Sequence, residues 1–335
     1  MSDAPAGGTV LTSDKLLLSE PNIVGGLLET SRTLANPGTL TARTLDYLRA
    51  SVSPNTRRAY HADLRHYLQW GGTIPSSVEL VAGYLASQAG VLSIATLARR
   101  LVTIGRAHTS LGLPSPTSSD LVRLTMRGIR RKHGRPQRQV AAAVKSDILA
   151  MLAPLGDNLR DKRDRALLLI GFAGAFRRSE LCAISCTDIR ICGHGAMITI
   201  SRSKTDQFGH GRRVVIPYGR DGACPVKALT DWLLASGIVD GPVFRGVSRY
   251  GRVAVRALSG EAVALIVKKR AAAAGLDQRR YAGHSLRAGF ATSAAAAGLA
   301  SWKIRKQTGH ASDAMLERYI REGDLLKDTE TAAVL

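Results

Sequence analysis

Residues 283–319 read GHSLRAGFATSAAAAGLASWKIRKQTGHASDAMLERY and contain the most informative pattern in this chain. A Gly-His-Ser-Leu-Arg start leads into a helix-forming run, then into Thr-Gly-His at 308–310, and finally into a segment with Tyr319 near its end. Two histidines, an arginine and a tyrosine therefore lie close to one another in a helical region. The apolar spacing predicts three helices, over 284–297, 300–306 and 313–320.

The chain around this segment is long, moderately apolar and strongly basic. Its 335 residues and 45% hydrophobic content are enough for two ordinary domains with buried cores. Its formal net charge is +21 at pH 7 and its isoelectric point is near 10.6. Lys and Arg dispersed along a chain without an acidic block usually bind a polyanion, so DNA or RNA is the expected partner. A basic protein that merely stays soluble is the alternative.

The order of predicted elements indicates a mainly α protein with a small antiparallel β-sheet. Residues 1–38 are rich in Gly, Ser, Thr and Pro with weak periodicity, which predicts a flexible N-terminal arm. Residues 39–132 show successive helical patterns and predict a compact helical bundle. Residues 133–144 combine Gly, Pro and charge, as domain linkers do. Residues 145–335 then form a second, mixed α and β domain.

The predicted helices of the first domain carry arginine on their polar faces. Such a face can follow a DNA backbone, because each guanidinium group can neutralise a phosphate charge. For any single residue, a solvated helix face is the equally weighted alternative. The candidates for DNA contact in this domain are Arg57, Arg58, Arg65, Arg99 and Arg100.

The second domain switches from helical to strand periodicity and back. Its longest apolar run, residues 166–176, is far shorter than the ~20 residues of a membrane span and predicts a buried helix. Residues 196–201 and 212–216 alternate as two strands do, and the polar residues between them predict a hairpin turn. Lys204 should lie on this hairpin. Helices are expected again over 225–236 and 259–274.

Several residues of the second domain have the chemistry that phosphodiester cleavage requires: a nucleophile, charge stabilisation and a proton for the departing alkoxide. Without a metal ion, arginine stabilises best, because its planar fork binds phosphate oxygens bidentately and stays protonated. Arg177 and Arg287 would form such a clamp. His284 lies three residues before Arg287, so both side chains point the same way at a helix start that favours an anion. Tyr319 is the candidate nucleophile, although a tyrosine on an amphipathic helix is more often a core residue.

The order of these residues resembles that of the tyrosine recombinases, the phage-integrase family. In that family an arginine, a lysine, a His-x-x-Arg motif, a histidine or tryptophan, and a tyrosine follow one another along the chain. Arg177 matches the first position, because the family's arginine stands three residues before a glutamate, here Glu180, which would brace the site. The other matches are Lys204, His284 with Arg287, His310, and Tyr319.

The resemblance implies a metal-free mechanism that needs no nucleotide cofactor. Tyr319 would attack the scissile phosphate to form a 3′-phosphotyrosyl bond, and Lys204 would protonate the departing 5′ oxygen to give the 5′-hydroxyl. The two arginines would hold the oxyanion, and the two histidines would assist with protons and hydrogen bonds. The covalent bond stores the phosphodiester energy, so a partner strand's 5′-hydroxyl can reseal it. Two exchanges through a Holliday junction imply double-stranded DNA with inverted-repeat half-sites and a homotetramer on paired sites.

The resemblance extends over most of the chain and is strongest to Cre-like members. SPNTRRAY at 53–60 looks like the family's N-terminal core-binding helix, and LGLPSP at 111–116 looks Cre-like. The resemblance also places the helix over 259–274 in the DNA major groove, where Glu261, Lys268 and Lys269 are candidate contacts. Two positions depart from the Cre-like pattern. His310 stands where tryptophan is expected there, and Gly260-Glu261 lies where a base-reading arginine is expected.

Two other functions would use overlapping residues. A type IB topoisomerase relaxes DNA as a monomer, whereas the pairing of a helical domain with a catalytic domain favours a recombinase. A catalytically idle DNA-binding regulator would keep the fold without the reaction. The complete set from Arg177 to Tyr319 argues against such a protein.

The cysteines and the N-terminus indicate the expected cellular setting. Cys182, Cys186, Cys192 and Cys224 form no Cys-x-x-Cys pair, so a zinc site that includes His194 would lack two close ligand pairs. Small buried thiols in a reducing compartment, and no bound metal, are expected instead. The start MSDAPAGG lacks the basic and apolar segments of a secretory signal, which predicts a cytoplasmic, nucleoid-associated protein.

Overall fold

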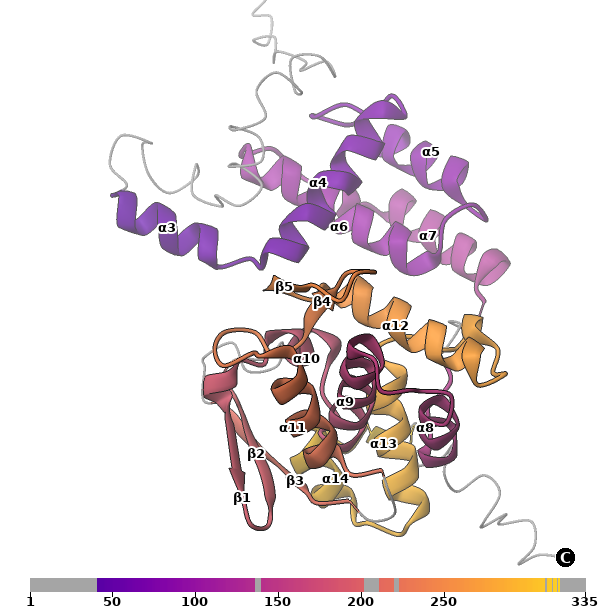
Figure 1. Cartoon of the computed structure of the whole chain (residues 1–335). Helices are drawn as coiled ribbons and strands as arrows, with labels where there is room; N and C mark the ends of the chain where they lie inside the picture. The colour runs from indigo at the N-terminus through magenta and orange to yellow at the C-terminus, as the bar shows by residue number, and fades with distance from the viewer. Residues whose placement is uncertain are drawn as a thin grey trace, which may run out of the picture. The chain divides into compact units, whose positions relative to one another are not determined.

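The computed structural model of the chain describes residues 41–135, 140–201, 211–219, 223–310, 312–314, 316–317 and 319. The chain divides into two compact units, one ending at Gln137 and the other beginning at Arg138 (Figure 1). This division falls inside the segment 133–144, where the sequence predicts a linker. The predicted arm over 1–38 lies outside the described residues.

The first unit is a bundle of helices that begin at serine caps. Ser53, Ser77, Ser93 and Ser119 each accept a hydrogen bond from the backbone N–H three residues later. Each serine thereby satisfies one of the donors that a helix start leaves unpaired. The helices of this unit are α3 (Ala42–Ala50), α4 (Pro54–Gln69), α5 (Val78–Gln88), α6 (Ile94–Ser110) and α7 (Asp120–His133), with the 3-10 helix η1 (Pro116–Ser118) before α7.

Aromatic and aliphatic side chains fill the core of the first unit. Helix α4 packs against α6, and α5 packs against α7. Tyr67 and Tyr84, both fully buried, meet edge to face with their ring centroids 4.9 Å apart. Leu97 and Ile104, about two turns apart on α6, are buried in the same core. The helical bundle predicted from periodicity is therefore present.

The second unit is built around a buried helix, α9. Residues 166–171 of this helix are all buried, and α9 lies between α11 and α13 (Figure 1). The prediction of a buried helix over 166–176 is right as far as Ala173, where α9 ends. The helices of this unit are α8 (Lys145–Leu152), α9 (Leu159–Ala173), α10 (Arg178–Ala183), α11 (Pro225–Ser236), α12 (Gly260–Ala273), α13 (Ser285–Ala296) and α14 (Ser301–Thr308), with the 3-10 helices η2 (Cys186–Asp188) and η3 (Gln278–Arg280).

Small antiparallel sheets complete the second unit. One sheet has the order β1 (Ile189–Cys192), β2 (Gly195–Ile200) and β3 (Arg212–Pro217), and the other pairs β4 (Arg245–Val247) with β5 (Val253–Ala257). The predicted hairpin is β2–β3, and Lys204 lies on its connection, outside the described residues. Strand β1 and the β4–β5 hairpin were not predicted, because they are too short and too exposed to show a clear alternation. The predicted class, mainly α with a small antiparallel sheet, is confirmed.

The segment that enters the second unit lies directly against α13. The Ala143 N–H donates to the Ser285 carbonyl oxygen at 2.9 Å, and the Lys145 N–H donates to Ser293 Oγ at 3.2 Å. A Cβ atom at Gly289 would overlap the Ala143 carbonyl group. Gly289 therefore allows this close approach, which fixes the helix that carries Arg287.

The described residues also bear on the questions of a membrane span, a metal site and buried thiols. None of the helices in this part of the chain is long and apolar enough to cross a membrane. Within the same residues, no three His, Cys, Asp or Glu side chains group as a metal site. The prediction of buried thiols is wrong: Cys192 is exposed at the end of an edge strand, and the other three cysteines are half-buried. Cys224 caps α11, since its Sγ accepts the Lys227 N–H.

Candidate active site

A turn after α9 places Arg177 at the start of α10. Ala175 has a φ of 47°, a left-handed conformation that is uncommon for residues other than glycine and often marks a functional site. Arg177 is the N-cap residue of α10, and its backbone N–H donates to Glu180 Oε2 at 2.9 Å. Its side-chain Nη1 donates to Glu180 Oε1 at 2.7 Å. Glu180 thus holds both the backbone and the side chain of Arg177.

Glu180 is a buried carboxylate that two arginines share. It is only 3% exposed, and its Oε2 also accepts a hydrogen bond from Arg212 Nη2 at 2.8 Å. Burial alone would raise the pKa of the Glu180 carboxyl group. The charge of Arg212 and the hydrogen bonds and charge of Arg177 outweigh this, so the pKa of Glu180 is lowered. The carboxylate therefore stays ionised at neutral pH.

Arg287 lies on the first turn of α13 and is almost completely buried. Its Nη1 donates to the Ala175 carbonyl oxygen at 3.1 Å and to the Thr308 carbonyl oxygen. Burial, followed by the nearby charge of Arg177, lowers the pKa of Arg287 to about 10. Arg287 remains a cation at neutral pH, next to a second cation.

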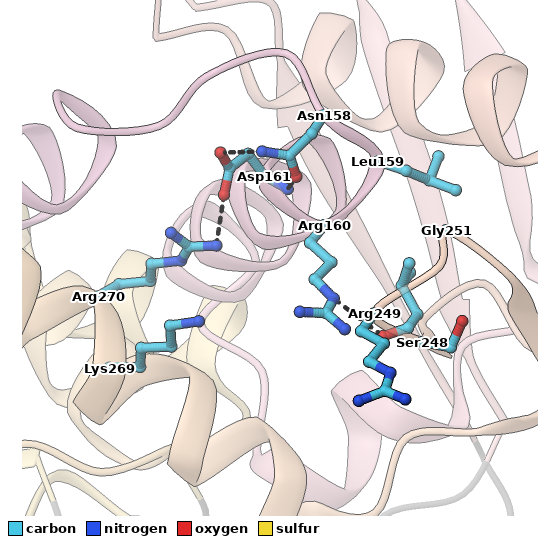
Figure 2. Close-up of a pocket in the computed structure, with 10 residues that line it drawn as sticks. Asn158, Leu159, Arg160, Asp161, Ser248, Arg249, Gly251, Lys269 and Arg270 are labelled. Atoms are coloured by element: carbon cyan, nitrogen blue, oxygen red, sulfur yellow. Dashed lines mark hydrogen bonds and ion pairs between the residues drawn. The ribbon is translucent and has the colours of Figure 1, made fainter.

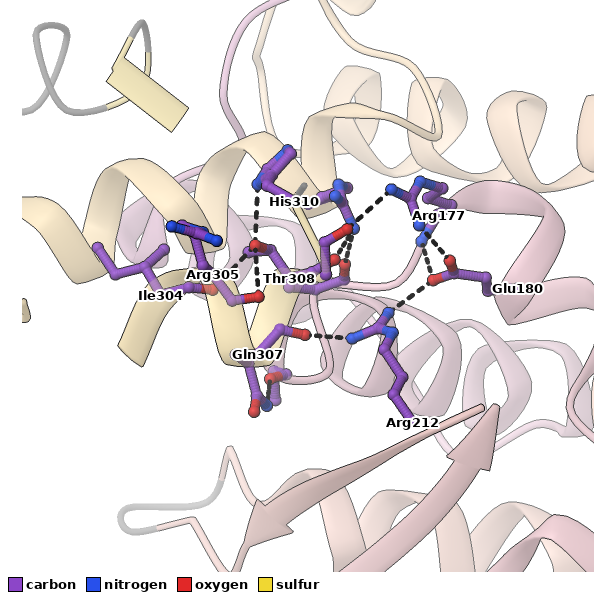
Figure 3. Close-up of polar contacts among 12 residues, drawn as sticks. Arg177, Glu180, Arg212, Ile304, Arg305, Gln307, Thr308 and His310 are labelled. Carbon is purple, nitrogen blue, oxygen red and sulfur yellow. Dashed lines mark hydrogen bonds and ion pairs between the residues drawn. The ribbon is translucent and has the colours of Figure 1, made fainter. Parts of the chain in front are cut away.

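The C-terminal end of α14 meets these arginines through three successive carbonyl groups (Figure 3). Arg212 Nη1 donates to the Gln307 carbonyl, Arg287 Nη1 to the Thr308 carbonyl and Arg177 Nη2 to the Gly309 carbonyl, the last at 3.0 Å. A helix end leaves its last carbonyls unpaired and carries a partial negative charge, so cations stabilise it. Gly309 then ends the helix with a φ of 68°, and His310 follows.

His310 is buried beside the arginines and is neutral. It is 8% exposed, and its Nδ1 lies 2.8 Å from Thr308 Oγ1. Burial, followed by the charges of Arg287 and Arg177, lowers the pKa of His310 to about 3. The contact with Thr308 fixes the orientation of the ring and leaves Nε2 as the nitrogen for a ligand.

The hydroxyl group of Tyr319 lies next to His284, the other histidine of the site. His284 Nε2 lies 2.8 Å from Tyr319 Oη, and the ring centroids of Tyr319 and His310 are 5.8 Å apart. Although the His284 ring reaches solvent, desolvation by its neighbours and then the charge of Arg287 lower its pKa. The Tyr319 ring packs against a small cluster that includes Leu316 and Ile304. Tyr319 is therefore partly a packing residue while its hydroxyl points to the site.

The structure gathers most of the predicted site residues in one place. Hydrogen bonds and a ring contact connect six of them, directly or through the α14 end: Arg177, Glu180, His284, Arg287, His310 and Tyr319. Lys204 lies outside the described residues. Arg212 joins the cluster although no motif pointed to it. Its position on β3 could have indicated this role. Alternate residues of a strand share one face, and Arg212 shares its face with the buried Val214 and Ile216. A cation on a buried face needs a partner of opposite charge or a hydrogen-bond acceptor.

The predicted DNA contacts of the first unit have different environments. Arg58 and Arg65 are exposed, and Arg57 is half-buried. Arg99 is half-exposed and binds Asp63 through its Nε at 2.6 Å. The expectation that Arg100 lies on the exposed face is wrong, because it is 8% exposed and contacts Asp63 at 3.5 Å and Tyr84 Oη at 2.7 Å. Asp63 is itself buried, and a buried carboxylate needs such cations.

Helix α12 starts at the predicted cap and exposes part of the predicted set. Ser259 Oγ accepts the Ala262 N–H at 3.0 Å. Glu261 and Lys269 are exposed, and Lys268 is half-buried. The next residue, Arg270, is buried and paired with Asp161 and Asp164.

A separate basic pocket of about 360 Å³ lies beside the end of α12 (Figure 2). It is formed by the start of α9, the β4–β5 loop and the second half of α12. Arg160, Arg249 and Lys269 line it with the ion pair between Arg270 and Asp161, whose atoms are 2.6 Å apart. None of the residues around Tyr319 lines this pocket. Its three unbalanced cations suit an anionic ligand.

Comparisons with known proteins agree with this geometry. The profile of the Phage integrase family matches residues 144–324. The integrase/recombinase XerD homologue of Selenomonas ruminantium is 40% identical over 292 residues, which cover 84% of this chain and 85% of that protein. Recombinase Cre of Escherichia phage P1 is 29% identical over 281 residues, which cover 78% of this chain and 79% of that protein.

The fold is similar to that of a solved recombinase structure. The XerH site-specific recombinase, bound to a palindromic difH substrate, has a TM-score of 0.64 at 16% identity, covering 93% of this chain and 94% of that one. The fold and the site together define a tyrosine recombinase. The chain belongs to the phage integrase family, as the order of its residues predicted. It is an enzyme that cleaves and rejoins DNA, and its likeness to Cre holds at a lower identity than its likeness to the XerD homologue.

Proposed function

We propose that this chain carries out site-specific DNA recombination with Tyr319 as the nucleophile. The observation that carries this proposal is the position of the Tyr319 hydroxyl, 2.8 Å from His284 Nε2 and beside a cluster of three guanidinium groups. A nucleophile in hydrogen-bond reach of a base, with cations where charge develops, is the arrangement that phosphoryl transfer requires.

The first step follows from the protonation states in the site. His284 has a lowered pKa, so it is neutral at pH 7 and can accept the Tyr319 proton. The phenolate oxygen then forms a bond to phosphorus, and the bond from phosphorus to the 5′ oxygen breaks. Lys204 is proposed to protonate that oxygen. The product is a 3′-phosphotyrosyl strand and a free 5′-hydroxyl, and the reverse reaction with a partner strand's 5′-hydroxyl completes an exchange through a Holliday junction.

The two catalytic arginines are proposed to stabilise the charge on the phosphate. Arg177 and Arg287 each use part of their guanidinium on protein carbonyls and carboxylates, which fixes their orientation. Their other N–H groups would bind the non-bridging oxygens. Neutral His310 would complete the set through Nε2. Glu180 is proposed to act as a support rather than to touch the DNA.

The partner proposed for the chain is double-stranded DNA with inverted-repeat half-sites, bound as a homotetramer on paired sites. Residues 39–132 would form the core-binding domain, residues 133–144 the linker and residues 145–335 the catalytic domain. The exposed arginines of the first unit and the cations of the basic pocket, including Lys269, would contact the phosphate backbone. The protein would act in the cytoplasm, on the nucleoid.

Covalent capture tests the proposal. The full chain is incubated with the DNA that flanks its own gene, the reaction is stopped in detergent, and the adduct is isolated and its cleavage position mapped. We expect an adduct with and without EDTA from the native chain and from Tyr250→Phe, a control at an exposed tyrosine. Tyr319→Phe should bind the same DNA and form no adduct. An adduct that persists in Tyr319→Phe would refute the assignment of the nucleophile.

A further inference from the structure

Arg212 is a cation of the active-site cluster whose role the family motif does not explain. It is the first residue of β3 and pairs with Ile200 across the hairpin. Its neighbour Arg213 points to the opposite, exposed side of the sheet. Two adjacent arginines therefore have different environments, and one of them is directed into the site.

The side chain of Arg212 connects separate parts of the site (Figure 3). Its Nη2 donates to Glu180 Oε2 at 2.8 Å, and its Nη1 donates to the Gln307 carbonyl oxygen. Its Cζ lies 5.9 Å from the centre of the Phe176 ring, directly before Arg177 in the chain. The side chain is 18% exposed. Arg212 thus contacts α10, the end of α14 and the turn that leads to Arg177.

Both contacts lead to residues that the proposed reaction uses. Glu180 holds Arg177, so a change in the position of Glu180 moves the guanidinium that would bind the phosphate. Gln307 lies three residues before His310, at the helix end whose next carbonyls bind Arg287 and Arg177. The packing is close, because a Cβ atom at Gly309 would lie only 3.1 Å from Arg212 Nε.

We propose that Arg212 is a positioning residue, which acts through Glu180 on Arg177 and through the Gln307 carbonyl on the loop that carries His310. This inference rests on the proposed function. Both terminal nitrogens of Arg212 donate to protein acceptors, and the proposal gives Arg212 no contact with the reacting phosphate. Removing it would leave Glu180 Oε2 with the Arg177 backbone N–H and would leave the Gln307 carbonyl without its side-chain donor.

The test compares Arg212→Met and Arg212→Lys with Arg213→Met, a matched control on the exposed side of β3. The rate of covalent adduct formation is measured in a single turnover on a nicked duplex that carries the mapped cleavage site. DNA affinity is measured on the same duplex by fluorescence anisotropy. We expect Arg212→Met to slow cleavage by about 10–100-fold, as the loss of a charge-assisted support does, with affinity changed less than about threefold. Arg212→Lys should recover part of the rate, since one ammonium can reach one acceptor, and Arg213→Met should match the native chain.

A double-mutant cycle shows whether Arg212 acts through Glu180. In a Glu180→Gln background, Arg212→Met should slow cleavage further by less than about threefold, because the shared partner is already changed. Equal slowing in both backgrounds, or a native rate in Arg212→Met, would overturn the inference. If thermal unfolding shows that Arg212→Met does not fold, the same cycle is measured with Arg212→Lys, and the same criteria then decide whether Arg212 acts through Glu180. Failure of the native chain to form an adduct would instead refute the proposed function, and this inference with it.

Discussion

Replacing Arg177 with lysine tests the phosphate clamp, because the change keeps the charge and removes the guanidinium fork. A guanidinium has five N–H donors. Arg177 uses side-chain nitrogens on Glu180 Oε1 at 2.7 Å and on the Gly309 carbonyl at 3.0 Å, which leaves three N–H donors for a phosphate. A lysine ammonium has three donors in all. If it kept both protein contacts, one donor would remain.

The expected cost follows from this loss of donors. Removing one preorganised oxyanion donor slows catalysis by about 10²–10³-fold, or about 2.7–4 kcal/mol, and we expect Arg177→Lys to slow adduct formation in that range. DNA affinity should change by less than about threefold, because the positive charge that contacts the backbone is kept. The assay is single-turnover adduct formation on the nicked duplex, with anisotropy for binding.

The matched control is Arg178→Lys, at the neighbouring exposed arginine. Arg178 packs its side chain against Gly260 and Gly283 rather than against Glu180. We expect this variant to cleave at close to the native rate. An unaltered rate in Arg177→Lys, together with a large loss in Arg178→Lys, would show that Arg178 holds the phosphate and that the clamp is wrongly assigned.

The other predictions concern base reading, pH and packing. Glu261→Gln should relax sequence preference at one or two base pairs per half-site, because Glu261 would accept a hydrogen bond from cytosine N4. If the variant and the native chain showed the same preference in a randomised half-site library, Glu261 would not be a base-reading residue. Lys268→Ala and Lys269→Ala should weaken all sequences alike and reduce the salt slope by about 1, so a sequence-dependent loss would contradict a phosphate role. His310 has a folded pKa of about 3, below the value of about 6.5 in the unfolded chain. The unfolded chain therefore binds the proton first as pH falls, and the free energy of unfolding decreases below pH ~6.5 by up to ~1.4 kcal/mol per pH unit. His310→Gln should show a smaller decrease in urea denaturation between pH 7 and 5, and equal slopes would refute this. Gly289→Ala should lower the free energy of unfolding by about 1–3 kcal/mol through overlap with Ala143, whereas Gly128→Ala, exposed on α7 with open space around it, should raise it by about 0.5–1 kcal/mol. A neutral Gly289→Ala would contradict the close approach.

Local signals in the sequence predicted the elements that have a strong period or a cap. Ser53 followed by Pro54 marks the start of α4, and Ser259 marks the start of α12, because both residues act through backbone groups a few residues away. The site residues followed from their order along the chain and the resemblance it carries. These signals need no knowledge of which helices pack together.

Partners far apart in the sequence could not be predicted in this way. Arg100 and Arg270 lie at positions that look polar and solvent-facing, yet each meets a buried carboxylate on another helix, Asp63 or Asp164. A helical period shows that a residue lies outside the apolar stripe, but it does not show that a carboxylate on another helix lies next to that residue. The partner of Arg212 could not be predicted either, because Glu180 is 32 residues earlier in the chain and on a different element.

The charge balance of the site explains why the pKa values of several of its basic groups are lowered. Arg177, Arg212 and Arg287 face one carboxylate, Glu180, and the pKa values of His284, His310 and Arg287 are all lowered, in part by these guanidinium charges. The α14 carbonyls supply only partial negative charge in return. A phosphodiester carries a full negative charge into this excess, so its binding removes repulsion that the free protein retains. The same charge would raise the pKa of His284, which strengthens it as a base for Tyr319 once the scissile phosphate is in place. The excess of cations would thus couple DNA binding to activation of Tyr319, the proposed nucleophile.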